Sequence, residues 1–163
     1  MTMTKNQKLD LLVVVAIVLF SVPIIVWFNV RPLVSTVFFF IIPSVYLLVR
    51  KPKNLKRIFT GAFLIGIVFG FVLDFLAILN NAWSEPIEQL VFKYKVLGIV
   101  PIDHIIWFFF WALVIIVFYE HFLEHERSDN ISQTFKYGLI PGITAMIAIL
   151  ALFLITPEAI QIG

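Results

Sequence analysis

Apolar residues along this chain are gathered into five long runs separated by short polar segments. The runs cover residues 9–28, 33–49, 58–79, 97–119 and 139–156. A helix needs about 20 consecutive apolar residues to cross the hydrocarbon core of a bilayer. The pattern therefore predicts an all-α fold, a polytopic membrane helical bundle with about five transmembrane helices.

The composition supports a membrane protein. Hydrophobic residues make up 61% of the 163 residues and charged residues 13%, whereas a soluble domain has about 45–50% apolar and about 25% charged residues. The net charge of only +2 argues against a nucleic-acid partner, and a chain without cysteine has no disulfide or thiolate metal site. Residues 1–163 are expected to form a single transmembrane domain.

Lysine and arginine are distributed unequally between the two sets of loops. Nine lie on the side of the N-terminus: Lys5, Lys8, Arg50, Lys51, Lys53, Lys56, Arg57, Arg127 and Lys136. Three lie on the other side: Arg31, Lys93 and Lys95. Because cytoplasmic loops carry the excess of these residues, we expect a multi-pass protein of the cell membrane with its N-terminus in the cytoplasm and its C-terminus outside.

Small residues and one acid recur every four positions along the third run, at Ala62, Gly66, Gly70 and Asp74. Residues four apart share one face of a helix, and small residues let two helix backbones approach closely in lipid. This face is expected to contact protein, either in the same chain or in a second copy. Asp74 would lie there too, about 7 Å from the helix end at 1.5 Å per residue.

The connection between the third and fourth runs has the pattern of an amphipathic helix. Ile87, Leu90, Val91 and Tyr94 are spaced i, i+3, i+4 and i+7, and charged or polar residues fill the other face. One interfacial helix is therefore predicted in addition to the transmembrane helices. It either links two spans along the surface or acts as a lid over the buried acid of the third run.

Three ionisable side chains fall within apolar runs on the same predicted membrane face: Asp74, Asp103 and His104. Such residues are costly to place in a bilayer and mark candidate functional sites. Helical spacing places Asp103 on one face with two tryptophans and His104 on the next face with a phenylalanine. The aromatic residues expected at this site are Trp83, Trp107, Phe108 and Trp111.

A carboxyl group in an apolar, aromatic pocket suits one kind of chemistry. Apolar surroundings disfavour the charged form, so such a group can hold a proton near neutral pH and deliver it to an isoprenoid double bond. Aromatic faces stabilise the resulting carbocation. A neighbouring double bond then closes a ring, and no redox cofactor is needed. The alternative is that the three side chains bond one another or the backbone and only fix the bundle.

Metal and nucleotide sites are not expected. His121, Glu124 and His125 match the HxxEH pattern of metalloproteases, but no remote third ligand is predicted on the same side, as catalytic zinc requires. We interpret this segment as a solvated helix end. The chain has no GxGxxG after a strand and no P-loop, which argues against a nucleotide or flavin cofactor.

Several of these residues occur in a recognisable order. The positions are Asp74-x-x-Ala77, Trp83, Gly98, Pro101-x-Asp103, an aromatic run and Tyr119-Glu120. This order resembles the lycopene cyclase domain of the membrane-embedded, heterodimer type. The similarity covers about residues 37–120, and the paired glutamates of that family fall at Asp103 and His104.

The resemblance implies acid-catalysed closure of β-ionone rings on lycopene, without net redox change, by an enzyme built from two such domains. Asp103 would be the proton donor, Asp74 its partner or the final base, and His104 a group that tunes or reloads the acid. The expected function is an intramembrane isoprenoid cyclase that acts on a polyene or prenyl lipid, as a homodimer or as a heterodimer with a similar small subunit. The alternative is a non-catalytic carotenoid- or lipid-binding membrane subunit.

Overall fold

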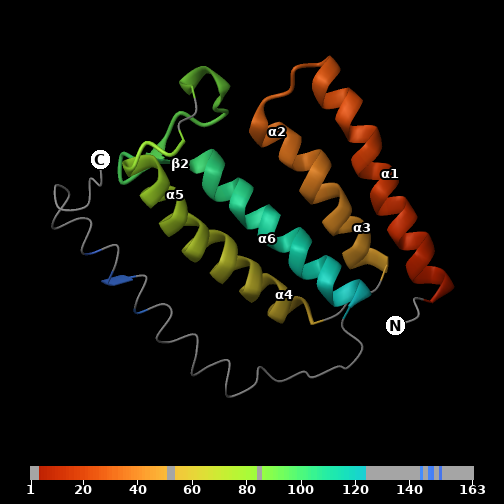
Figure 1. Cartoon of the computed structure of the whole chain (residues 1–163). Coiled ribbons are helices and arrows are strands. Elements are labelled where there is room, and N and C mark those ends of the chain that lie inside the picture. Colours follow the sequence, from red (N-terminus) through yellow and green to blue (C-terminus); the bar gives the residue numbers. More distant parts are fainter. Residues whose placement is uncertain are drawn as a thin grey trace.

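Long helices dominate the computed structural model, which describes residues 4–50, 54–83 and 86–123 and residues 144, 147, 148 and 151. Within this part of the chain, four helices are long and apolar enough to cross a membrane. They are α1 (Lys5–Trp27), the continuous helices Pro32–Arg50 and Leu55–Leu79, and α6 (Ile102–Phe122). Figure 1 shows α6 between the two continuous helices, with α1 at the outer edge.

The two middle helices each contain a π-helical turn. The first consists of α2 (Pro32–Thr36), η1 (Val37–Ile41) and α3 (Ile42–Arg50). The second consists of α4 (Leu55–Ala62), η2 (Phe63–Phe69) and α5 (Gly70–Leu79).

Four of the five predicted runs are thus helical, with ends that differ from the prediction by a few residues. The largest difference is in the fourth run, where the helix begins at Ile102 and not at residue 97. Of the predicted fifth run, 139–156, only residues 144, 147, 148 and 151 are described, and all four are helical. The rest of that run lies outside the described residues.

The bundle is organised around α6. On one side α6 contacts α4, η2 and α5, and on the other it contacts α2, η1 and α3, while α1 packs on η1 and α3. A core of buried apolar side chains fills the space between these helices at the end where α6 finishes. Its members are Val14, Leu47, Ile58, Ala62, Leu113, Val117 and Phe122.

The predicted small-residue face packs on α6 of the same chain. A Cβ atom built on Gly66 would lie 2.6 Å from the carbonyl oxygen of Phe108 and from the Cα of Phe109. A Cβ atom on Gly70 would lie 2.8 Å from the side chain of Phe108. The prediction that this face contacts protein is confirmed, and the contact is intramolecular. The face is therefore not a place where a second copy can bind.

Gly66→Ala is expected to destabilise the bundle by about 1–3 kcal/mol, the usual cost of overpacking. The added methyl group meets backbone atoms of α6, which cannot rotate away, so the two helices must separate. Gly61→Ala is the matched control, because its Cβ would meet only the mobile Cδ1 of Ile116, at 3.1 Å. Reversible unfolding in mixed detergent micelles measures both variants. Equal stability of the two would contradict the close contact.

A network of charged side chains joins three helices at the end of the bundle that contains Lys5, Arg50, Lys56 and Arg57, here called the basic end. Asp10 of α1 is buried. Its Oδ1 accepts hydrogen bonds from Tyr46 Oη and Arg50 Nε, both at 2.8 Å, and its Oδ2 lies 3.0 Å from His121 Nε2. Arg57 and Glu120 form a second ion pair nearby.

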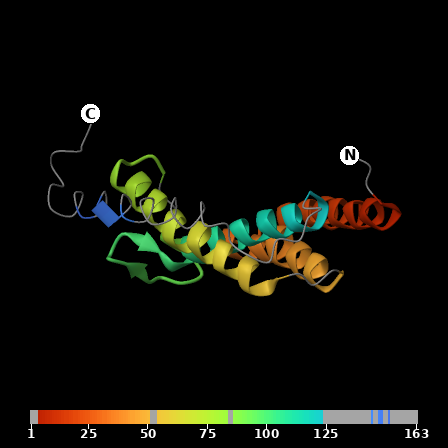
Figure 2. The same cartoon turned by 90° about the horizontal axis from the view of Figure 1, so that it is seen from below.

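The predicted interfacial helix between the third and fourth runs is wrong. The described residues of this segment form a single 3-10 turn, η3 (Ile87–Gln89), and an antiparallel hairpin of β1 (Lys95–Val96) and β2 (Val100–Pro101). Figure 2 shows the hairpin beside the end of α5, far from the N-terminus.

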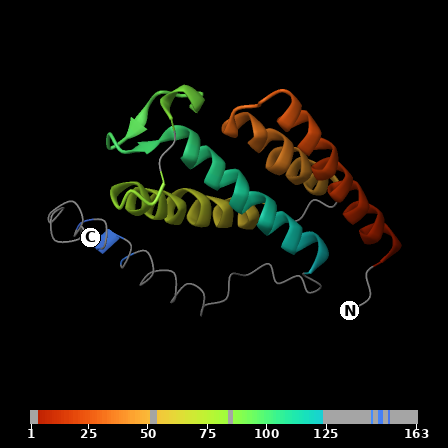
Figure 3. The same cartoon turned by 45° about the horizontal axis from the view of Figure 1, so that its top comes forward.

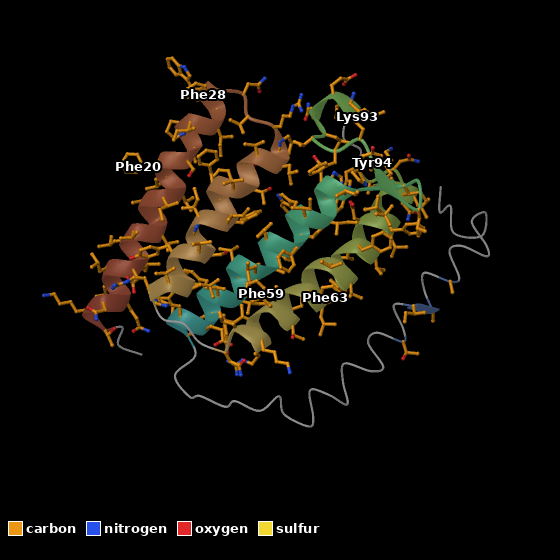
Figure 4. All side chains as sticks on the ribbon, turned by 180° about the vertical axis from the view of Figure 1, so that it is seen from behind. Phe20, Phe28, Phe59, Phe63, Lys93 and Tyr94 are labelled. Carbon is orange, nitrogen blue, oxygen red and sulfur yellow. The ribbon has the colours of Figure 1, made fainter. Side chains whose placement is uncertain are left out.

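Tertiary hydrogen bonds explain why the helical spacing failed. The amides of Val91 and Phe92 donate to the carboxylate of Asp103 and not to carbonyl groups one turn earlier in the chain. Of the four apolar positions that suggested a helix, only Leu90 is buried, and Tyr94 is 74% exposed. Lys93 and Tyr94 project from this segment in Figure 4.

Large apolar side chains cover the outside of the bundle. Phe20 of α1 is 73% exposed and Phe28, just after α1, is 71% exposed, and both point away from the other helices in Figure 4. A soluble monomer rarely exposes continuous apolar surface of this kind. The surface is compatible with a multi-pass membrane protein.

Candidate functional site

A cavity of about 410 Å³ lies between α2, α5 and α6 at the end of the bundle opposite the basic end. We call this end the loop end, because it carries the segment 80–101; Figure 3 shows that segment beside the start of α6. The cavity is lined by Pro32, Leu33, Asp74, Trp83, Asp103, His104, Trp107 and Phe108. Six of the seven side chains predicted for the site therefore lie around one hollow.

Asp74 lies near the end of α5 and is completely buried. Its Oδ1 accepts a hydrogen bond from Trp83 Nε1 at 2.8 Å, and its Oδ2 lies 2.8 Å from His104 Nδ1. The His104 side chain is 17% exposed. Asp74 and His104 thus form an ion pair or hydrogen-bonded couple at the wall of the cavity.

The way in which α5 ends places Trp83 beside Asp74. The amide of Ala82 donates to the carbonyl of Ala77 at 2.9 Å, and Asn81 has a φ of 52°. This is the Schellman arrangement, in which asparagine is one of the few residues that accepts the left-handed conformation. It turns the chain back over the helix end, so that the Trp83 indole reaches the carboxylate.

Asp103 has different partners from Asp74. It lies in the first turn of α6, and its side chain turns toward the segment that precedes the hairpin. Its Oδ2 accepts from the amide of Val91 at 2.7 Å, and its Oδ1 accepts from the amide of Phe92 at 2.9 Å. Asp103 is 4% exposed. Both carboxylate oxygens therefore accept hydrogen bonds from backbone amides. The carboxylate also lies close to the N-terminus of α6, which favours a negative charge.

An aromatic cluster on α6 forms another wall of the cavity. The Trp107 ring lies edge-on to Phe108, with centroids 5.0 Å apart, and edge-on to Phe40 of η1, at 5.6 Å. Trp111 stacks on Trp107 at 6.3 Å and does not line the cavity itself. The predicted shared face of Trp107 and Trp111 is confirmed, and Trp111 supports the wall from the next turn.

His104 and Phe108 share the next face of α6, as predicted, and this face meets α5. Phe108 packs on Gly70, and His104 meets Asp74 four residues further along the same face of α5. The small-residue face therefore makes the Asp74–His104 contact possible, because it brings α5 close enough to α6 for the two side chains to bond.

Sequence reasoning missed two groups of residues at or near the cavity. Pro32 and Leu33 at the start of α2 line the cavity, and nothing in the sequence distinguishes them from other helix-start residues. The amides of Val91 and Phe92 were also missed. A carboxylate two residues after Pro101, at the start of a helix, was a usable signal for an anion that accepts hydrogen bonds from backbone amides.

No group of three His, Cys, Asp or Glu side chains in the described part of the chain could hold a metal ion. Of the HxxEH motif, His121 bonds Asp10, while Glu124 and His125 lie outside the described residues. A second hollow of about 370 Å³ is lined by apolar side chains alone: Ile67, Val68, Phe71, Val72, Val96, Ile105 and Ile147. The cavity at the loop end is therefore the candidate for chemistry among the described residues.

Comparison of the chain with protein-family models, with curated proteins and with solved structures finds no match. The similarity to the lycopene cyclase domain rests on the order of residues described above and stays a prediction.

Proposed function

We propose that this chain is an intramembrane isoprenoid cyclase of the lycopene cyclase type. The observation that carries the proposal is the Asp74–His104 couple, buried at the wall of an aromatic cavity inside an apolar helical bundle. A volume of about 410 Å³ falls within the range of about 300–1,000 Å³ found for small-molecule sites. Such a cavity can hold the reacting end of a prenyl chain while the rest of that chain lies in lipid.

The membrane placement follows the distribution of charge over the bundle. Arg50, Lys56 and Arg57 belong to the basic end, which would face the cytoplasm together with the N-terminus. The loop end with its cavity would then face the outside of the cell membrane, and the predicted C-terminus would lie there as well. A substrate dissolved in the bilayer would reach the cavity from the membrane and meet Pro32 and Leu33 of α2 as part of its lining.

The proposed reaction begins with transfer of a proton from a carboxyl group to a terminal carbon–carbon double bond. The π electrons form the new C–H bond, and the adjacent carbon becomes a cation that the faces of Trp107 and Phe108 stabilise. A neighbouring double bond attacks this cation and closes the ring. Loss of a proton from the ring then restores both a double bond and the acid, so the reaction is an isomerisation.

Expression of the chain in a lycopene-accumulating bacterium tests the function. Chromatography of the pigments is expected to show monocyclic or bicyclic carotenes, because the cavity holds an acid and an aromatic wall together. Unchanged lycopene, with the protein shown to be in the membrane, would count against the cyclase. Co-expression with a similar small subunit extends the test to the heterodimer.

A second function is favoured by the saturation of both carboxylates. Each oxygen of Asp74 and of Asp103 already has a hydrogen-bond partner within the protein. This arrangement suits a non-catalytic subunit that binds a carotenoid or another lipid in the cavity. Purification of the chain with an unmodified polyene, recognised by its visible absorption, would support that function over the cyclase.

The proposed partner is a second copy of the chain or a similar small subunit. The Gly66–Gly70 face is occupied by α6, so a dimer must use another surface. The exposed apolar residues of α1, such as Leu19 and Phe20, leave that helix available to a partner or to lipid.

A further inference from the structure

The two aspartates that line the cavity differ in their hydrogen-bond partners. Asp74 is bonded by side chains, the indole of Trp83 and the imidazole of His104. Asp103 is bonded by two consecutive backbone amides, those of Val91 and Phe92. An imidazole can give up or take a proton near neutral pH, whereas a backbone amide only donates its hydrogen bond.

The hydrogen bonds of Asp103 fix a segment of irregular backbone. Leu90 precedes the two amides and is 3% exposed, and the carbonyl of Tyr94 just beyond them accepts from the amide of Ile102 at 3.1 Å. Three hydrogen bonds thus connect the segment 90–94 to the start of α6, and the Asp103 carboxylate accepts two of them. Without that carboxylate, two amides lose their acceptors.

We propose that Asp103 is a positioning residue that fastens the segment 90–92 beside the cavity, and that Asp74, coupled to His104, is the acid that protonates the isoprenoid. This assignment rests on the proposed cyclase function. It reverses the roles that the sequence motif implies for the two aspartates, because Asp103 is bonded by backbone amides, whereas one of the two partners of Asp74 is an imidazole that can exchange a proton.

In this assignment Asp74 both gives the proton to the substrate and receives the proton that the ring loses. Its O–H bond breaks while the alkene π electrons form a C–H bond. The Trp83 N–H is directed at one oxygen of the carboxylate that remains, and His104 Nδ1 lies 2.8 Å from the other oxygen, to which it donates when the imidazole carries a proton on Nδ1. Donors already aimed at a developing charge need no reorganisation at the moment of reaction. After ring closure, the proton lost from the ring returns to the Asp74 carboxylate.

Two measurements on one set of variants test the assignment. Asp103→Asn is expected to lower the ring-closing rate by about tenfold through displacement of the segment 90–92 and of the Asp103 side chain that lines the cavity, and Asp74→Asn by about 100-fold or more through loss of the acid. The pH profile of the residual activity in proteoliposomes should be unchanged in Asp103→Asn. Loss of activity in Asp103→Asn to the level of Asp74→Asn would overturn the proposal.

Hydrogen exchange gives a readout that does not depend on activity. In Asp103→Asn, a peptide that contains the amides of Val91 and Phe92 is expected to exchange about 10- to 100-fold faster than in the wild type, as loss of a charge-assisted hydrogen bond predicts. In Asp74→Asn the same peptide should exchange at the wild-type rate. Unchanged exchange in Asp103→Asn would overturn the positioning role, even if the wild type formed no cyclic product and the cyclase function failed.

Val91→Pro tests the hydrogen bonding of Asp103 to the segment 90–92 separately from the presence of its carboxyl group. Proline removes one of the two amides that Asp103 binds and leaves the carboxyl group in place. Leu90 before it already has the extended backbone that proline requires (φ −73°, ψ 139°). The variant is expected to lose activity about as much as Asp103→Asn, and the double variant no more than either one. Additive losses would show that Asp103 acts beyond this segment and would overturn the proposal.

Discussion

Asp74→Asn is expected to lower ring closure by about 10²- to 10⁴-fold, the usual contribution of a general acid, while the bundle stays folded. Asparagine has the shape of aspartate, and its oxygen can still accept from the Trp83 indole. Its amide group can face His104 Nδ1 once the imidazole adopts the tautomer that accepts there. The variant therefore removes the transferable proton with little change in packing. Product analysis in lycopene-accumulating cells, normalised to membrane protein, gives the measurement.

Glu88→Gln is the matched control for this prediction. It is the same chemical change at an exposed acid of η3, outside the cavity. Its ring-closing rate should equal that of the wild type. Wild-type activity in Asp74→Asn, with the protein folded, would show that Asp74 only joins α5 to α6 and would return the donor role to Asp103.

The sequence was sufficient to predict the four long helices of the described residues because each of these apolar runs is long and uninterrupted. It also predicted the packing face of the third helix, because Gly66 and Gly70 fall one turn apart, and no other residue fits 2.6 Å from a neighbouring backbone. The same face fixed which side of that helix carries Asp74. These features depend on residues close in sequence, which periodicity reports directly.

The segment before α6 could not be predicted in this way. Its helical spacing was genuine, but its amides bond a carboxylate 11 and 12 residues away in sequence. The hairpin turns at Leu97 and Gly98, which both have positive φ values, 53° and 73°. Leucine is an unusual residue there, and the strong Asn-Gly or Asp-Gly signal for a tight hairpin is missing.

The sequence also did not predict which groups bond each of the two acids. The motif brought Asp103 and His104 together because they are adjacent, although neighbouring residues on a helix point to different faces. In the structure His104 turns toward α5 and Asp103 toward the segment 90–92. Asp74 and His104 therefore bond each other across two helices, and a contact between different helices produces no periodicity in the sequence.

At the basic end, Asp10→Ala is expected to destabilise the bundle by about 3–5 kcal/mol, the cost of removing one partner from a buried ion pair. The carboxylate of Asp10 accepts from Tyr46, Arg50 and His121, and so joins α1, α3 and α6. Arg50 has 41% of its side chain exposed and can regain water or lipid headgroups. The effect should therefore lie near the lower value and come mainly from the buried His121 and Tyr46.

Tyr46→Phe separates the charge from the hydrogen bond in this network. It removes one donor and leaves Asp10 bonded to Arg50 and His121, so the expected loss is only about 1 kcal/mol, the value for one hydrogen bond. Reversible unfolding in mixed detergent micelles compares the two variants. A loss in Asp10→Ala no larger than that in Tyr46→Phe would show that α1 is held mainly by its packing on α3 and η1 and by the hydrogen bond from Gln7 to the carbonyl of His121. A clear difference would mean that one buried carboxylate fixes the position of α1, whose outer surface is otherwise free to bind lipid or a partner.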